Sequence, residues 1–166
     1  AELSTPTSAV LRSTYTNAAL GALRSVAGDA VRAVVTDGRR IACIEAANPA
    51  APTLGGLRDA AGTNSTLFLH RVALAGPAAA AAAGEAGIRV FNVPGMTPAG
   101  ALATPGPALD VAASGTTAYV ACVTSGWVVV DVSTPSAPAQ VGGVHAGQGA
   151  VRALGAAGPW VQVASA

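Results

Sequence analysis

The apolar residues of this chain fall in short runs that are separated by turns containing glycine. Three such segments each begin with a glycine, contain a second one, and end at an acidic residue or an asparagine. They are GDAVRAVVTDGRRIACIE at 28–45, GPAAAAAAGEAGIRVFN at 76–92 and GTTAYVACVTSGWVVVD at 115–131. A further copy, GPWVQVASA, starts at residue 158. Each full segment indicates a turn, a strand, a glycine-containing turn and a second strand, which together predict a repeated β-hairpin.

Local propensity disagrees with this repeat in one place. The segment PAAAAAAGE at 77–85 would be a helix if the propensity of alanine alone decided its structure. The alignment of the repeats instead places it on the strand that TTAYVACVT forms in the next copy. A helix would interrupt the repeat, so we predict a strand.

A corner containing proline follows the second strand of the repeat. DVSTPSAP at 131–138 is the clearest copy, and EAANPAAP at 45–52 keeps the acid and both prolines. ELSTP at 2–6 matches the acid and Ser-Thr-Pro, while NVPGMTP at 92–98 is looser. An acid or asparagine can accept hydrogen bonds from backbone amides one or two residues on, and prolines end strands. We therefore predict turn caps, with a role in a ligand or ion site as the alternative, at Glu2, Glu45, Asn92 and Asp131.

These corners divide a single domain, residues 1–166, into four units. The units are 2–44, 45–91, 92–130 and 131–166, the last of them incomplete. A period of about 40 residues with about four short strands is typical of propeller blades, and strands that are apolar on both faces fit a sheet between two neighbours. We predict an all-β fold, a β-propeller or partial propeller of about four blades. Its ring is closed either by pairing of the two termini or by another chain or further sequence.

The clearest copy resembles a known repeat. The string TTAYVACVTSGWVVVDVSTPSAPAQVGG, residues 116–143, resembles the LVIVD repeat. It has the Ala-Tyr-Val-Ala strand, the glycine turn, the strand ending in Val-Asp-Val-Ser, the Pro-x-x-Pro spacing and the final Val-Gly. The resemblance is strong at about 109–143 and degenerate at 2–6, 28–56 and 76–100. It implies a β-propeller of a kind common in secreted, cell-surface or membrane-attached proteins, with no catalytic residues defined by the repeat.

Composition adds that the core has small side chains and that the surface carries little charge. Hydrophobic residues make up 51% of the chain but aromatic residues only 4%, so the packing has to be tight and repeated. Charged residues make up 10%, against about 25% in ordinary soluble domains, which suggests that a partner or further copies cover part of the surface. A net charge of +1 with scattered arginines does not favour binding of nucleic acid.

Two uncharged stretches, 90–109 and 111–130, have the length of a membrane-spanning helix. The first contains four prolines, and the second is interrupted by Ser-Gly-Thr-Thr and Thr-Ser-Gly, so we predict no membrane span. The chain starts at Ala1 rather than at a methionine. We expect that an upstream segment, such as a signal peptide, has been removed.

The residues that most often carry chemistry are few. Cys43 and Cys122 are predicted to be buried apolar thiols, with a single disulfide as the alternative, and no nearby base favours a catalytic cysteine. His70 and His145 lack the spacing of metal ligands, so we expect loop histidines. Asn64 begins an Asn-Ser-Thr sequon and would accept a glycan in a protein secreted by a eukaryote. We predict no cofactor and no metal.

The sequence therefore favours a non-enzymatic propeller scaffold or interaction module, a structural subunit of an extracellular or cell-surface assembly. It would bind protein partners or copies of itself, and the insertion at 55–70 is the best candidate for a partner-specific surface. The rival hypothesis is a hydrolase or lactonase-like enzyme that uses a carboxylate such as Asp110 or Glu85, with or without a metal. A truncated repeat fragment without activity of its own is the third.

Overall fold

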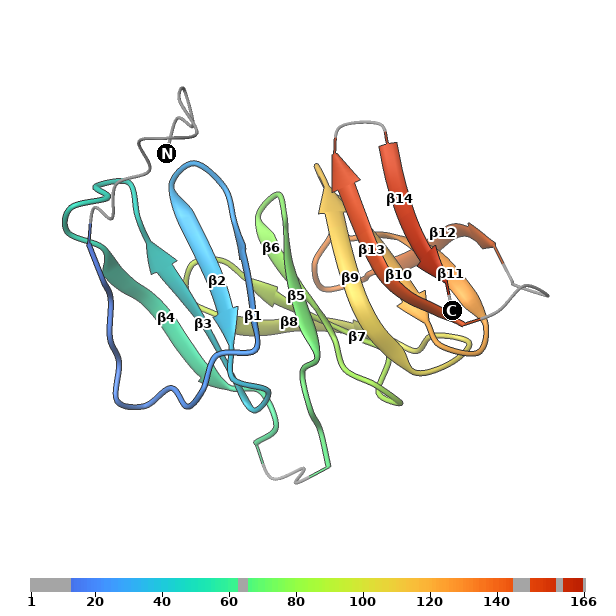
Figure 1. Ribbon diagram of the computed structural model, residues 1–166, viewed down its shortest axis with the longest axis horizontal. Helices are drawn as coiled ribbons and strands as arrows, with labels where there is room; N and C mark the ends of the chain where they lie inside the picture. Colours follow the sequence, from blue (N-terminus) through green and yellow to red (C-terminus); the bar gives the residue numbers. More distant parts are fainter. Residues whose placement is uncertain (1–12, 63–65, 145–149, 158–159, 166) are drawn as a thin grey trace.

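The computed structural model describes residues 13–62, 66–144, 150–157 and 160–165. Within these ranges the regular structure consists of strands, which form three four-stranded sheets and one two-stranded sheet (Figure 1). All the strand pairs in the four sheets are antiparallel.

The strands follow one another along each sheet in the order of the chain. The first sheet holds β1 (Ser25–Gly28), β2 (Arg32–Thr36), β3 (Arg40–Glu45) and β4 (Thr53–Asp59). The second holds β5 (Arg71–Ala75), β6 (Ala78–Ala82), β7 (Ile88–Asn92) and β8 (Thr97–Leu102). The third holds β9 (Ala108–Ser114), β10 (Thr117–Cys122), β11 (Gly126–Asp131) and β12 (Ala139–Val144). The C-terminal sheet holds β13 (Val151–Ala157) and β14 (Trp160–Ser165).

Successive sheets meet through their first strands. β1 contacts β5, β5 contacts β9, and β9 contacts β13. Sheets of four antiparallel strands that are packed face to face, with the first strands innermost, are the blades of a β-propeller. The predicted fold class is confirmed: the chain is an all-β propeller with four sheets in its described part, the last of them two-stranded.

The disputed alanine segment is a strand, as the repeat predicted. All five residues of β6 are buried, because this strand lies in a sheet that has a neighbour on each face. Ala80 packs into the apolar cluster shared with the third sheet, and Ala81 packs into the cluster shared with the first sheet. Burial on two faces outweighs the small helical preference of each alanine.

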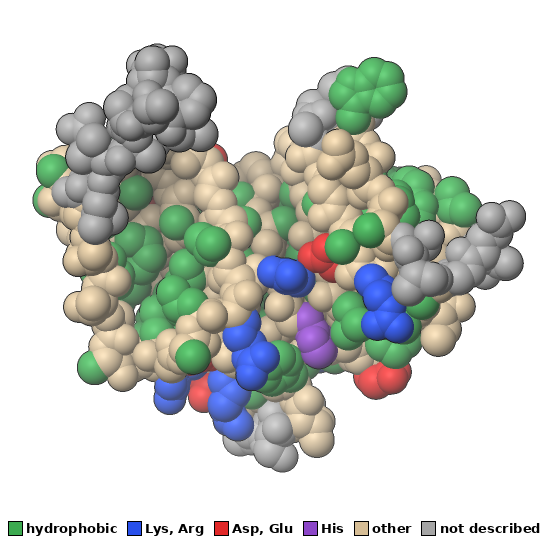
Figure 2. All heavy atoms as spheres, viewed as in Figure 1, with side chains coloured by type: hydrophobic (Ala, Val, Ile, Leu, Met, Phe, Trp, Pro, Cys, Tyr) green, Lys and Arg blue, Asp and Glu red, His purple; other side chains and the backbone are tan. Residues whose placement is uncertain are grey.

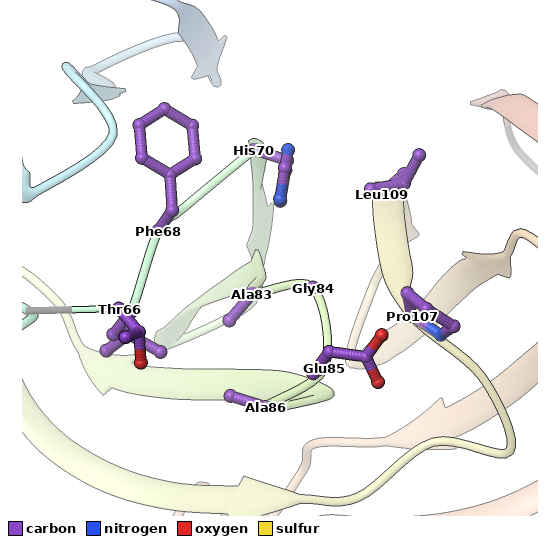
Figure 3. Close-up of a pocket in the computed structure, with 10 residues that line it drawn as sticks. Thr66, Phe68, His70, Ala83, Gly84, Glu85, Ala86, Pro107 and Leu109 are labelled. Carbon is purple, nitrogen blue, oxygen red and sulfur yellow. The ribbon is translucent and has the colours of Figure 1, made fainter. Parts of the chain in front are cut away.

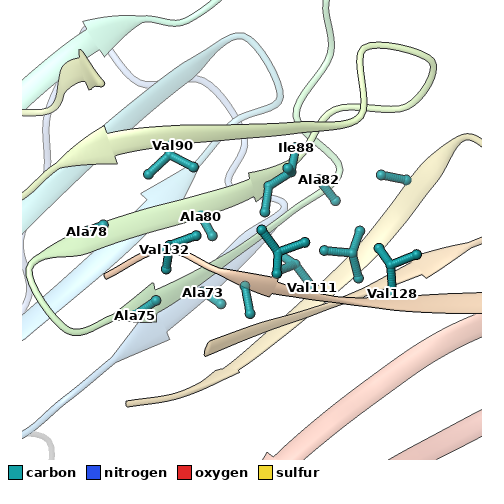
Figure 4. Close-up of a cluster of buried hydrophobic side chains, with 14 of the residues drawn as sticks. Ala73, Ala75, Ala78, Ala80, Ala82, Ile88, Val90, Val111, Val128 and Val132 are labelled. Carbon is teal, nitrogen blue, oxygen red and sulfur yellow. The ribbon is translucent and has the colours of Figure 1, made fainter. Parts of the chain in front are cut away.

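The third strands of the first two sheets present every second side chain to the following sheet. Ile41 and Cys43 of β3 lie in the cluster between the first and second sheets. The equivalent Ile88 and Val90 of β7 lie in the cluster between the second and third sheets, where they face side chains of the third sheet (Figure 4). All four side chains are at most 1% exposed. The third strands therefore carry much of the packing between blades.

The proline corners join the third strand to the fourth in the four-stranded sheets, and the corners of the second and third sheets pack on a glycine of the preceding sheet. A Cβ atom added to Gly56 of β4 would lie 2.5 Å from the carbonyl oxygen of Pro94. A Cβ atom added to Gly100 of β8 would lie 2.5 Å from the carbonyl oxygen of Pro135 and 2.7 Å from Cδ of Pro138. Because glycine has no side chain, the corner of the next blade can pack closely at these two positions.

The sheets are offset from the units that the corners mark in the sequence. β4, for example, pairs with β3, although a corner lies between them. The units 45–91 and 92–130 thus each supply the fourth strand of one sheet and the first three strands of the next. In the described part of the chain, no helix is long and apolar enough to cross a membrane.

Candidate functional site

The corner after β11 is held by the first residue of its motif. Oδ1 of Asp131 accepts a hydrogen bond from the backbone N–H of Ser133 at 2.8 Å. This hydrogen bond lowers the pKa of the Asp131 carboxyl below its ordinary value. Asp131 is half-buried, and the geometry of this contact is that of an Asx turn.

The other corners use different contacts. The side-chain amide of Asn92 donates to Oγ1 of Thr97 at 3.2 Å across its corner. In the corner after Glu45, Oδ1 of Asn48 accepts a hydrogen bond from the backbone N–H of Ala50 at 3.1 Å. Glu2 lies outside the described residues. These contacts serve the local turns, and they do not bring the motif residues together around a common centre.

Asp110, a candidate for carboxylate chemistry, instead links three sheets. It lies in β9 and is 9% exposed. Its Oδ2 accepts a hydrogen bond from the N–H of Leu154 in β13 at 2.7 Å, and its Oδ1 accepts from the N–H of Val111 at 2.9 Å. Nε of Arg71, in β5, lies 3.8 Å from Oδ1. A carboxylate with these contacts connects the C-terminal sheet to its neighbours.

A pocket of about 360 Å³ opens at one end of the second and third sheets (Figure 3). It is lined by residues 66–68 and 70, before β5, by 83–86 in the turn between β6 and β7, and by 107 and 109 at the start of β9. Two backbone hydrogen bonds of 2.9 Å between Gly84, which lines the pocket, and Ala108 join the two sheets. Sequence reasoning missed this pocket, because the three segments are far apart along the chain.

His70 is the polar centre of the pocket wall. Its ring lies edge-on to Phe68 at 5.1 Å, and Cζ of Arg24 lies 4.8 Å above the Phe68 ring. Burial, and secondly the charge of Arg24, lower the pKa of His70 below its ordinary value. The imidazole is therefore neutral at pH 7. Glu85 lines the same opening and points toward Pro107 in Figure 3.

The remaining candidates do not form a reactive centre in the described residues. Cys43 and Cys122 are buried free thiols in two separate clusters, which confirms the interpretation as apolar core thiols. Burial raises the pKa of both thiols. No group of three or more possible metal ligands occurs in the part of the chain that the structure describes. His145 and Asn64 lie outside that part.

The comparison with protein families agrees with the clearest repeat. The model of the LVIVD repeat matches residues 105–145, which include the third sheet. The resemblance drawn from residues 116–143 is confirmed. No curated protein matches the sequence.

Solved structures share the fold at low sequence identity. The computationally designed Ika4 protein is 14% identical, with a TM-score of 0.68 over 95% of this chain and 92% of that one. The computationally designed Ika8 protein is 15% identical, with a TM-score of 0.64 over 87% of this chain and 43% of that one. Apo AztD from Citrobacter koseri is 14% identical, with a TM-score of 0.59 over 88% of this chain and 42% of that one. This chain thus spans less than half of Ika8 and of AztD, and these likenesses concern the fold alone.

Proposed function

We propose that this chain is a non-enzymatic interaction module, a propeller scaffold that binds another protein through its C-terminal strands. The observation that carries the proposal is a set of large apolar side chains on β12 and β14 that lie in solvent. They are Val141, 63% exposed, Val144, 55%, Trp160, 75%, and Val163, 44%. Figure 2 shows hydrophobic side chains at the surface on the side of the molecule that carries these strands.

These side chains differ sharply from those of the neighbouring strands. Val120 of β10 and Val128 of β11 are fully buried, although they belong to the same sheet as β12. Large apolar residues exposed on the surface of a charge-poor protein favour an interface, and tryptophan is often among the residues that dominate binding. With a net charge of +1, apolar contact rather than long-range electrostatics would drive the association.

The proposed setting is extracellular or at the cell surface, within a larger assembly. The support is the resemblance to the LVIVD repeat, a repeat common in secreted and cell-surface proteins. A fractionation of the source organism with an antibody against the chain tests this part. Recovery of the protein in the cytosolic fraction alone contradicts it.

Size-exclusion chromatography with light scattering, followed by affinity capture from the extracellular fraction, tests the interaction role. We expect association or a retained partner, and a marked loss of either in the variant Val144→Ser/Trp160→Ser. Val26→Ser, which changes an exposed valine of β1, is the matched control and should behave as the parent chain. A folded monomer that retains no partner contradicts the proposal. A chain without cooperative unfolding by circular dichroism would favour the truncated-fragment hypothesis.

The pocket supports a second candidate, a hydrolase. It places the neutral imidazole of His70 and the carboxylate of Glu85 on one opening, and such a pair suits general acid–base chemistry. The test is hydrolysis of a panel of lactones and esters by the chain and by Glu85→Gln. Turnover that Glu85→Gln abolishes would establish this candidate. Stoichiometric calcium or zinc in elemental analysis would favour its metal-dependent form.

A further inference from the structure

The boundary between the first and second sheets and the boundary between the second and third sheets are built on equivalent residues. Gly38 and Gly84 each lie two residues after the end of a second strand, β2 or β6. The carbonyl oxygen of Gly38 accepts a hydrogen bond from the N–H of Leu69 at 2.7 Å, and that of Gly84 accepts one from Ala108 at 2.9 Å. Leu69 and Ala108 both lie seven residues before the glycine that opens the next repeat segment. The two boundaries can therefore be compared position by position.

An aromatic ring fills the first boundary. Phe68 directly precedes Leu69, and its ring lies against Gly38. A Cβ atom added to Gly38 would collide with this ring, to which its three nearest atoms belong. Cζ of Arg24 lies 4.8 Å from the centre of the same ring. The close approach of the ring depends on the missing side chain of the glycine.

A proline has the equivalent place at the second boundary. Pro107 directly precedes Ala108 and thus corresponds to Phe68. Apart from the chain neighbours of Gly84, the described atoms within 4 Å of a Cβ atom added there belong to His70, the nearest being Nε2 at 3.3 Å. The ring of Pro107 therefore does not cover this glycine. The pocket of about 360 Å³ lies here instead, with Gly84 and Pro107 in its lining.

The pocket lining carries one charge, and it is negative. Glu85 has no ion-pair or hydrogen-bond partner among the described residues. Figure 3 shows its carboxylate turned toward Pro107, on the side of the opening away from Phe68. His70 is neutral at pH 7, because burial and the charge of Arg24 lower its pKa. An unpaired carboxylate beside a mainly apolar opening favours a ligand with a positive charge.

We propose that this pocket binds a small aromatic amine. The ring of the ligand lies against Gly84 and Pro107, beside the imidazole of His70, and so takes the place that a phenylalanine ring fills at the first boundary. Its ammonium group meets the carboxylate of Glu85. The volume is at the lower end of the range for ligand pockets, which fits a compound with a single ring. Such a site requires binding alone and is independent of the interaction role.

The probe is 2-phenylethylamine, and two analogues show which part of it is recognised. 2-Phenylethanol has the same ring without the charge, and 2-cyclohexylethylamine has the charge without a flat aromatic ring. Isothermal titration calorimetry on the full chain measures all three. We expect saturable, millimolar binding of the probe, because a ligand with one ring has few atoms to contribute. Each analogue should bind at least about threefold more weakly, since one loses the ion pair and the other the aromatic contact.

Two variants test where the probe binds. Glu85→Gln removes the charge and should bind the amine no more tightly than the alcohol, about threefold more weakly than the parent chain does. Pro107→Phe supplies the ring that the first boundary has, so it should fill the pocket and abolish binding of both compounds. Pro105→Phe changes a proline of the same connection outside the pocket lining and is the control, which should bind as the parent chain does. Circular dichroism checks that each variant is folded.

Four results would overturn the proposal. These are no saturable binding of 2-phenylethylamine by the folded chain, equal binding of 2-cyclohexylethylamine, unchanged binding by folded Pro107→Phe, or an unchanged preference for the amine over the alcohol in Glu85→Gln. If Pro107→Phe does not fold, Glu85→Gln decides alone, because Glu85 is an exposed turn residue. A chain that binds the amine but retains no protein partner would keep this site and lose the interaction role. The reverse result would do the opposite.

Discussion

Two interfaces in this propeller are built on equivalent residues and differ in completeness. Between the second and third sheets, Ile88 and Val90 of β7 are fully covered. Between the third and C-terminal sheets, Trp127 and Val129 occupy the same places on β11 and are half-buried. The strands have the same register and the same apolar character. The burial of a side chain in a propeller is therefore decided by the neighbouring blade as much as by its own strand.

The largest expected effect separates the two interfaces directly. Val90→Asp places an unpaired charge in the complete interface and should lower the free energy of unfolding by about 3–5 kcal/mol, a large part of the stability of a typical domain. Val129→Asp, at the equivalent place in the incomplete interface, should cost less than half as much because its carboxylate reaches water. Urea unfolding followed by circular dichroism measures both. Equal losses would show that the third sheet is covered on both faces in solution.

A smaller effect is expected from the two glycines that correspond to each other in β8 and β12. Gly100→Ala pushes a methyl group against Pro135 and Pro138 and should cost about 1–3 kcal/mol through overpacking. In Gly142→Ala the added methyl group contacts no other sheet. The free energy of unfolding of this variant should therefore rise or fall by no more than about 1 kcal/mol. The same unfolding measurement checks the pair. A large loss of stability in Gly142→Ala would contradict the absence of a contact with another sheet at this glycine.

Asp110 gives a more local prediction, because it ties β13 to β9. Asp110→Asn keeps one acceptor oxygen but loses the charge that strengthens the contact with the N–H of Leu154, at a cost of about 1–2 kcal/mol. Hydrogen exchange should show faster exchange in β13, while the amides of β6 keep their protection. Asp29→Asn changes a turn aspartate of the first sheet and is the control. Unchanged exchange in β13 would mean that the C-terminal sheet is held by packing alone.

The sequence predicted the repeated parts of this fold and missed the parts that depend on distant segments. The strand at β6 followed from the alignment of the repeats, against the local preference of alanine. The proline corners were predicted from the sequence. Their packing on Gly56 and Gly100 was not, because these contacts join one blade to the next. The corners that divide the sequence into units lie between the third and fourth strands of the sheets.

In the candidate site, too, the sequence predicted local features and missed contacts between distant segments. His70 was expected to be a loop histidine, and its place in a pocket depends on residues 83–86 and on Leu109, which no spacing rule connects to it. Asp110 was considered for carboxylate chemistry, since the sequence gives no sign that its partner is a backbone amide of β13. The two cysteines were assigned correctly because burial of a small apolar thiol needs no specific partner.

The smallest expected effect concerns the corner between β11 and β12 of the third sheet. Its hydrogen bond from Ser133 lowers the pKa of Asp131, so the carboxylate stabilises the fold above the ordinary aspartate pKa of about 3.9. This contribution is lost as the pH falls through the lowered value, where the folded state also becomes protonated. Asp131→Ala should therefore be slightly less stable than the parent at pH 7 and should approach it in acid. Asp131→Asn, which keeps an acceptor oxygen, should lose less at pH 7. Thermal unfolding across this pH range checks the sign, and a gap between Asp131→Ala and the parent that stays constant with pH would show that the carboxylate charge plays no part in this corner.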